Sequence, residues 1–247
     1  PLTYKELEPY YTKAEYLIGV AGPDVQGARW RSASYPQPAH PLSPAAQRLA
    51  EAGQRMDLPF EPNSRAALSQ SYDGRPACNY CGQCSRGCPL GDKGSADVTF
   101  LKHAAATGRL KLIPEARVVN IEAARDGRIA AVHYVHEGRR IRQETPQLIL
   151  AGGAVQTPRL LLASHSAQTP DGLANGSGQV GRNFMETLSW HSTALLPGLR
   201  NSHMGLPADA IAWSQSAPDG VPQAIGGCRY TSAVQVIGLT GPAAYAS

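Results

Sequence analysis

Four cysteines lie within a short stretch of this chain, at Cys78, Cys81, Cys84 and Cys88, and a proline follows the last of them. The C-x2-C-x2-C-x3-C-P spacing is that of bacterial ferredoxins, whose thiolates hold an iron–sulfur cluster. Thiols two or three residues apart on a tight loop can converge on one soft metal centre without long-range folding. Disulfides rarely bridge such short spacings, because their geometry is restricted. The run therefore predicts a three-iron or four-iron cluster held by these cysteines.

Two other interpretations of the cysteine run stay open. Four thiolates also suit a tetrahedral zinc ion, although zinc sites usually pair two short knuckles across a longer insert. Alternatively, the thiols hold no metal and only pack within the loop or form a disulfide. The sequence contains no second cysteine run, so three of the four thiols could serve a three-iron cluster.

A second segment has the composition of a nucleotide-binding turn. Residues 147–151 form an apolar run that predicts a short buried strand, Gly152 and Gly153 interrupt it, and Thr157-Pro158 can open a helix. In mononucleotide-binding folds such a junction brings backbone and a helix N-terminus close to phosphate. The segment lacks the G-x-G-x-x-G pattern, so a plain turn remains the alternative.

The composition excludes several classes of protein. The 247 residues are 42% hydrophobic, which is enough for a core, while 25 glycines and 20 prolines indicate many turns. The net charge of +4 is modest and the basic residues are scattered, which argues against nucleic-acid binding. No apolar run reaches the length of a membrane span.

The elements around the two segments can be predicted from local signals. Thr3 and Glu6 form a capping box for a helix that ends near Gly19. Ser43 and Pro44 open a second helix, and Ser95 could cap a third that runs to residue 106. Further expected elements are strands at 110–113, 117–124 and 129–135, with a hairpin turn at Asp126-Gly127, and a helix from Thr157 to Ser164.

Taken together, ordered blocks of the chain resemble the glucose–methanol–choline (GMC) oxidoreductase family. The blocks are residues 1–11, the cysteine-rich loop at 73–95, the segment 150–162 with its Thr-Pro pair, and the Val-Gly-Arg-Asn-Phe-Met stretch at 180–185. The cysteine-rich loop is similar to that of one bacterial branch of the family.

The resemblance implies an α/β protein that comprises part of a Rossmann-like FAD-binding domain and part of an antiparallel-sheet substrate domain. It implies oxidation of an alcohol carbon, often on a sugar or polyol, by hydride transfer to FAD. Val118 falls where the family presents backbone to the adenine, and Ala151, Gly152 and Gly153 fall beside the ADP half of FAD. In the branch with the cysteine-rich loop, some members relay electrons through an iron–sulfur cluster to a carrier protein.

The family's first dinucleotide fingerprint and its block with the catalytic histidine are not found in this sequence. We therefore expect an internal piece of a longer flavoprotein, inactive by itself and without assignable catalytic residues. Residues 1–187 would belong to the FAD-binding domain and 188–247 to the start of the substrate domain. An alternative function is an iron–sulfur electron-transfer or metal-binding module without catalysis. The compartment stays open between bacterial cytoplasm and periplasm.

Overall fold

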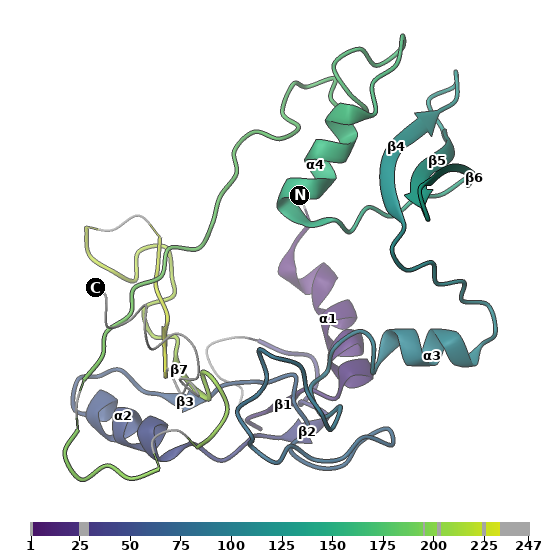
Figure 1. Ribbon diagram of the computed structural model, residues 1–247. Coiled ribbons are helices and arrows are strands. Elements are labelled where there is room, and N and C mark those ends of the chain that lie inside the picture. Colours follow the sequence, from purple (N-terminus) through teal and green to yellow (C-terminus); the bar gives the residue numbers. More distant parts are fainter. Residues whose placement is uncertain (1, 25–29, 195, 202–203, 224–225, 233–247) are drawn as a thin grey trace. The chain divides into compact units, whose positions relative to one another are not determined.

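The computed structural model describes residues 2–24, 30–194, 196–201, 204–223 and 226–232. Its helices are α1 (Tyr4–Ile18), α2 (Pro44–Gln54), α3 (Phe100–Ala106) and α4 (Gly153–Ala163). Its strands are β1 (Ala21–Gly22), β2 (Gln37–Pro38), β3 (Glu61–Pro62), β4 (Arg117–Ala123), β5 (Ile129–His136), β6 (Arg139–Glu144), β7 (Ala210–Ala212) and β8 (Tyr230–Thr231). This mixture of helices and sheets agrees with the predicted α/β class (Figure 1).

The chain divides into two compact units, which we treat separately. Unit 1 comprises Pro1–Leu110 together with Ala194–Ser247, and unit 2 comprises Lys111–Thr193. Unit 1 contains the parallel pair β1-β2 and the antiparallel sheet β3-β7-β8. Unit 2 contains the antiparallel sheet β4-β5-β6.

Helix α1 begins and ends as its capping signals predict. The Thr3 hydroxyl accepts the Glu6 backbone N–H, and the Glu6 carboxylate accepts the Thr3 backbone N–H at 2.7 Å. At the other end Gly19 adopts the left-handed conformation, with φ of 80°. A side chain there would meet Leu68 at 2.7 Å, so both backbone conformation and space require glycine.

Helix α1 also holds the segment that follows it. The buried Glu8 carboxylate accepts the Ser32 backbone N–H and the Thr12 hydroxyl, each at 2.8 Å. The hydrogen bond from Ser32 is the main cause that lowers the pKa of Glu8. Arg31 forms an ion pair with Glu15 of the helix. These contacts fix residues 30–35 along α1.

Helix α2 is anchored at its N-terminus by a carboxylate from far along the chain. Ser43 caps the helix through the Ala46 N–H, and the Ser43 N–H donates to the Asp209 carboxylate at 2.5 Å. The second Asp209 oxygen accepts the Ser232 hydroxyl at 2.6 Å. Asp209 is only 2% exposed and directly precedes β7. This one side chain therefore joins α2 to the β3-β7-β8 sheet.

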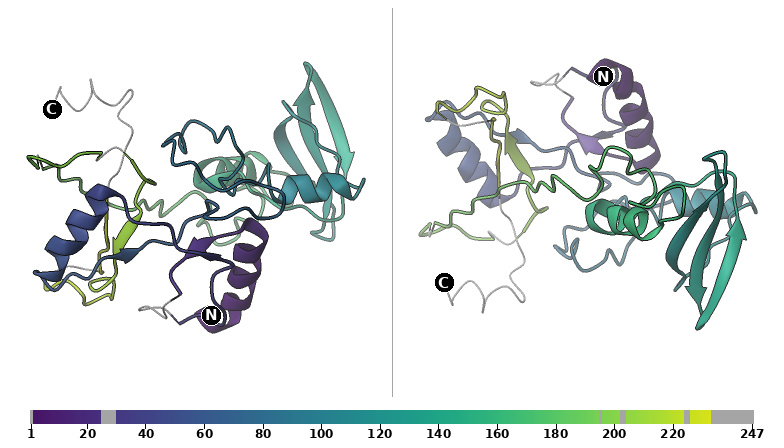
Figure 2. Two further views of the ribbon diagram at one scale, coloured as in Figure 1. Left: turned by 90° about the horizontal axis from the view of Figure 1, so that it is seen from below. Right: turned by 90° about the horizontal axis from the view of Figure 1, so that it is seen from above.

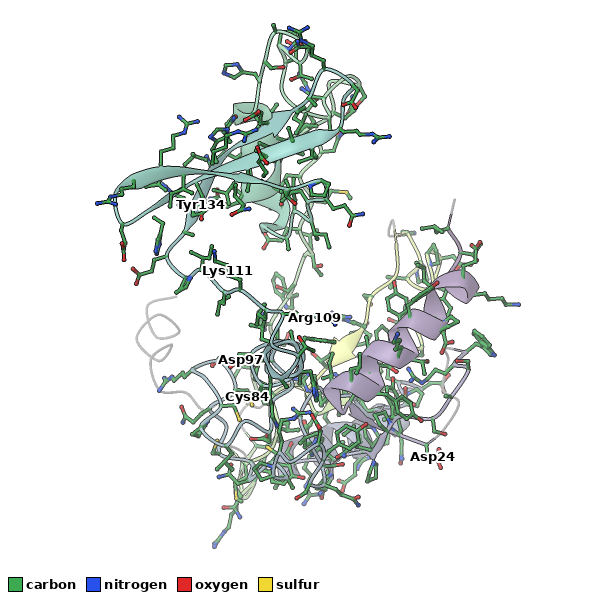
Figure 3. The ribbon with its side chains drawn as sticks, turned by 90° about the vertical axis from the view of Figure 1, so that its right-hand side faces the viewer. Asp24, Cys84, Asp97, Arg109, Lys111 and Tyr134 are labelled. Carbon is green, nitrogen blue, oxygen red and sulfur yellow. The ribbon has the colours of Figure 1, made fainter. Side chains whose placement is uncertain are left out.

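Unit 2 is built on a three-stranded sheet with α4 beside β4, and Tyr134 lies in the middle strand (Figures 2 and 3). The Asp126-Gly127 turn and its two strands are confirmed. Strand β6 was not predicted. It follows a two-residue turn in which Glu137 and Gly138 both have positive φ, as a type I′ hairpin requires.

The open edge of β4 is closed by Ser164 at the end of α4. Strand β4 is an edge strand, and the Ile121 N–H donates to the Ser164 hydroxyl at 2.9 Å. That hydroxyl donates in turn to the Leu160 carbonyl at 2.7 Å. Ser164 and Ile121 are both buried. The serine thus ties the helix to the sheet.

Replacing Ser164 with alanine should destabilise unit 2 by about 1–2 kcal/mol, because the buried Ile121 N–H loses its acceptor. Hydrogen exchange of the amides of β4 would measure the loss. The exposed Ser177→Ala variant is the matched control. Equal protection in the two variants would contradict the proposed tie.

Four sequence predictions were wrong in detail. Helix α4 begins at Gly153 rather than at Thr157, so Pro158 lies inside the helix. Helix α3 begins at Phe100 rather than after Ser95, because residues 96–99 form a turn in which the Thr99 hydroxyl donates to the Ser95 carbonyl. Residues 110–113 and 147–151 form no strand, and Ile149 is 92% exposed. Neither segment has a strand partner in the described part of its unit, and a strand needs one.

The described part of the chain contains four helices. None of them combines the length and the apolar character that crossing a bilayer requires.

Candidate functional site

The cysteine-rich loop belongs to unit 1 and is closed at its base by backbone pairing. Residue Ala67 pairs with Lys93, and the Leu68 N–H donates to the Asp92 carbonyl at 3.2 Å. The Cys78 N–H then donates to the Leu68 carbonyl at 2.8 Å. Leu68 is fully buried, so the base of the loop is part of the unit's core.

Two charged side chains form hydrogen bonds with cysteine residues of the loop. Cys84 lies among the irregular segments of unit 1 (Figure 3), where the Lys93 ammonium donates to its carbonyl at 2.7 Å. The Cys88 thiol donates to the Asp92 carboxylate at 2.7 Å. Asp92 is 4% exposed, so its carboxylate is an internal acceptor. Gly82 and Gly87 both have positive φ, which the tight turns of the loop require.

The surroundings of Cys78 and Cys84 favour the protonated forms of these two thiols. Burial is the main cause that raises the pKa of Cys78 to about 12, and hydrogen bonding to Asp92 acts in the same direction. Burial likewise raises the pKa of Cys84. Among the described residues, no three or more cysteine, histidine or carboxylate side chains are grouped to hold a metal ion.

The observed loop therefore does not fit a cluster. Thiols that hold a metal centre must converge on one point. Here Cys88 is directed to a carboxylate, and the four thiols are not gathered as ligands. We derive no electron-transfer step through the loop.

A hydrogen bond between His40 and Tyr80 connects the cysteine-rich loop to the segment that follows β2. His40 is 4% exposed, and its Nε2 lies 2.9 Å from the Ala67 carbonyl, so this nitrogen carries the proton. Its Nδ1 then accepts the Tyr80 hydroxyl at 3.0 Å. Burial lowers the pKa of His40, in keeping with a neutral ring. Tyr80 has a φ of 56°, a conformation that tertiary contacts must support.

The variant Tyr80→Phe should weaken the attachment of the cysteine-rich loop, because the buried His40 Nδ1 loses its hydrogen-bond donor. We expect a loss of about 1–2 kcal/mol in local stability and faster alkylation of Cys78 and Cys81. The exposed Tyr10→Phe variant is a control without a hydrogen bond to lose among the described residues. Alkylation rates that match those of this control would contradict the role of the pair.

In unit 2 the glycine segment lies at the open N-terminus of α4. Ala151, Gly152 and Gly153 are all exposed. Gly152 is the N-cap and supplies no side chain, so the first turn of α4 has no side-chain cap. Gly153 has a φ of 78°, and a side chain placed there would meet no atom within 4 Å. The Gly152 N–H donates to the Thr157 hydroxyl at 3.2 Å. The N–H groups of the first turn that follows have no side-chain cap, and such a helix start is the kind of surface that a phosphate can approach closely.

Val118 lies on β4, next to an irregularity of the ladder. It pairs with Tyr134, the next pair is Asn120 with His133, and Val119 has no counterpart in the register. Such bulges redirect backbone groups and are frequent near binding sites. Ile121, later in β4, contacts Ser164 at the end of α4, so the two elements begin at the same end of the unit (Figure 1).

The exposed glycine backbone and the bulge are therefore compatible with the ADP half of FAD. The structure brings Val118 and the glycine segment into one unit, while the four cysteines belong to the other. The sequence analysis missed Asp92 and His40. The only sequence signal for Asp92 was its place as an acidic residue in a loop otherwise rich in cysteine and glycine. No local pattern marked His40.

Comparisons with known proteins connect these segments to one family. A family described as GMC oxidoreductase matches residues 2–188. The chain is 35% identical to 6'''-hydroxyparomomycin C oxidase of Streptomyces lividus, over 76% of this chain and 35% of that protein. It is 31% identical to the fructose dehydrogenase large subunit of Gluconobacter japonicus, over 75% of this chain and 34% of that protein.

A third relative extends the match toward the C-terminus. Paromamine 6'-oxidase of Streptomyces fradiae is 32% identical over 94% of this chain and 44% of that protein. The chain thus spans well under half the length of these curated relatives.

Proposed function

Because this chain belongs to the GMC oxidoreductase family, we propose that the protein containing it oxidises a CH–OH group of a sugar, polyol or related alcohol with FAD as hydride acceptor. The observation that carries the proposal is the family match over residues 2–188. The names of the relatives, which are oxidases and dehydrogenases of sugars and aminoglycosides, support the substrate class.

The chain's own contribution is to position the cofactor. We assign Ala151, Gly152 and Gly153 to the ADP half of FAD and the Val118 backbone to its adenine. The exposed backbone and the uncapped first turn of α4 support this assignment. The chemistry that bound FAD supplies is acceptance of hydride from the alcohol carbon. The residue that accepts the hydroxyl proton is not assigned within this chain.

We also propose the domain division at residue 187. Residues 1–187 would form part of the FAD-binding domain, and 188–247 would begin the antiparallel-sheet substrate domain. The end of the family match at residue 188 supports this boundary. An electron-carrier protein remains a proposed partner.

The purified complete protein tests the proposal. We expect a yellow, flavin-containing protein that reduces an artificial acceptor with at least one alcohol from a panel that includes fructose, gluconate and paromamine. A protein without flavin that is brown from iron and sulfide would instead support the alternative of a non-catalytic electron-transfer module. Analysis for iron and acid-labile sulfide after anaerobic purification separates the two outcomes, and it also tests the cluster hypothesis for Cys78, Cys81, Cys84 and Cys88.

A further inference from the structure

One face of helix α2 borders an open surface hollow of about 740 Å³. The helix residues that line it recur at positions i, i+3, i+4, i+7, i+8 and i+11, so they form a single stripe along the helix. They are Pro44, Gln47, Arg48, Glu51, Ala52 and Arg55. The core-facing residues of α2, Ala46 and Gly53, lie outside this stripe.

The opposite wall of the hollow is the segment 196–200, which passes beside α2 (Figure 1). A turn shapes this segment: the Leu199 N–H donates to the Leu196 carbonyl, and Gly198 between them has a φ of 80°. Arg200 follows the turn and also lines the hollow. Its volume lies within the range of small-molecule sites in proteins.

The charge of the lining is strongly one-sided. Three arginines and one glutamate, all exposed, line the hollow, and the Glu51 carboxylate forms an ion pair with Arg48 at 2.9 Å. Within the described part of the chain, Arg55 and Arg200 form neither an ion pair nor a side-chain hydrogen bond. Two cations are thus left without a counter-ion beside a hollow that also has apolar walls from Leu196, Pro197 and Leu199.

Guanidinium groups bind planar carboxylates and phosphates with paired, charge-assisted hydrogen bonds. We propose that this hollow binds a small molecule that carries at least two oxyanion groups, with Arg55 and Arg200 as its principal ligands. The lining residues belong to unit 1, whereas the residues assigned to FAD belong to unit 2. The proposal therefore does not depend on the flavin function.

Isothermal titration calorimetry on the complete, flavin-loaded protein tests this site with two probes, inorganic pyrophosphate and citrate, at constant ionic strength. We expect saturable binding of at least one probe, and the responding probe tells phosphate from carboxylate recognition. The double variant Arg55→Gln/Arg200→Gln should weaken binding about tenfold or more.

The matched control is Arg125→Gln, which removes one exposed arginine from the turn after β4. It should leave the affinity unchanged. Absence of saturable heat with both probes would overturn the proposal. Equal affinity of the double variant and the control would overturn it too, since the anion would then bind elsewhere. Circular dichroism of the double variant checks that α2 is intact.

Discussion

The Gly153→Val variant of the complete protein should bind FAD at least about tenfold more weakly than the wild type. Gly153 has a φ of 78°, a conformation that a β-branched residue adopts only with strain of about 1–3 kcal/mol. The space beside its backbone is open, and a valine side chain would fill the region through which we propose that FAD approaches. Fluorescence titration of the apoprotein with FAD measures the effect.

The matched control for this prediction is Gly127→Val. Gly127 has a nearly identical φ of 81°, and it too has no neighbour within 4 Å, but it lies in the turn between β4 and β5. The same strain is thus introduced without touching the proposed cofactor contact. If both variants bind FAD equally well, the assignment of Gly153 is wrong.

The Asp209→Ala variant should destabilise unit 1 by about 3–5 kcal/mol, because two buried donors lose their acceptor at once. These donors are the Ser43 N–H, which opens α2, and the Ser232 hydroxyl. Ser43 and Ser232 are 3% and 4% exposed, so water cannot readily replace the carboxylate. Hydrogen exchange over residues 42–54 and 208–213 would report the loss.

Two further variants test whether the loss of stability arises from the Asp209 carboxylate. Asp209→Asn keeps one acceptor oxygen, so it should cost about 1–2 kcal/mol. The exposed Asp219→Ala variant should change nothing. A loss no larger in Asp209→Ala than in Asp219→Ala would show that α2 is anchored by other contacts.

Elements whose ends are fixed by neighbouring residues could be predicted from the sequence. The capping box at Thr3, the Ser43-Pro44 start of α2 and the Asp126-Gly127 turn are each confirmed. In all three cases the groups that satisfy the backbone lie within a few residues, so the pattern carries the information.

Elements that depend on distant partners could not be predicted. The apolar residues 147–151 have the composition of a buried strand, but they pair with no strand in the described part of unit 2. Similarly, Asp209 meets Ser43 across most of the chain, and no local pattern connects the two.

In the candidate site, too, the local features could be predicted from the sequence and the contacts between distant residues could not. The cysteine spacing identified the loop, yet the acceptor of the Cys88 thiol, Asp92, became evident only in three dimensions. The spacing of thiols predicts what they could bind. The spacing does not determine how the surrounding hydrogen bonds orient the thiols. In the structure the Cys88 thiol donates to the Asp92 carboxylate, and the thiols do not converge on one point.

The most direct test of the family-based function is anaerobic mixing of the complete, purified protein with each alcohol of the substrate panel, followed by visible absorption. One alcohol should bleach the oxidised flavin and yield one carbonyl product for each flavin reduced. A protein that binds no flavin, or a flavin that stays oxidised with every alcohol, would contradict the proposal that this chain is part of an FAD-dependent alcohol oxidoreductase.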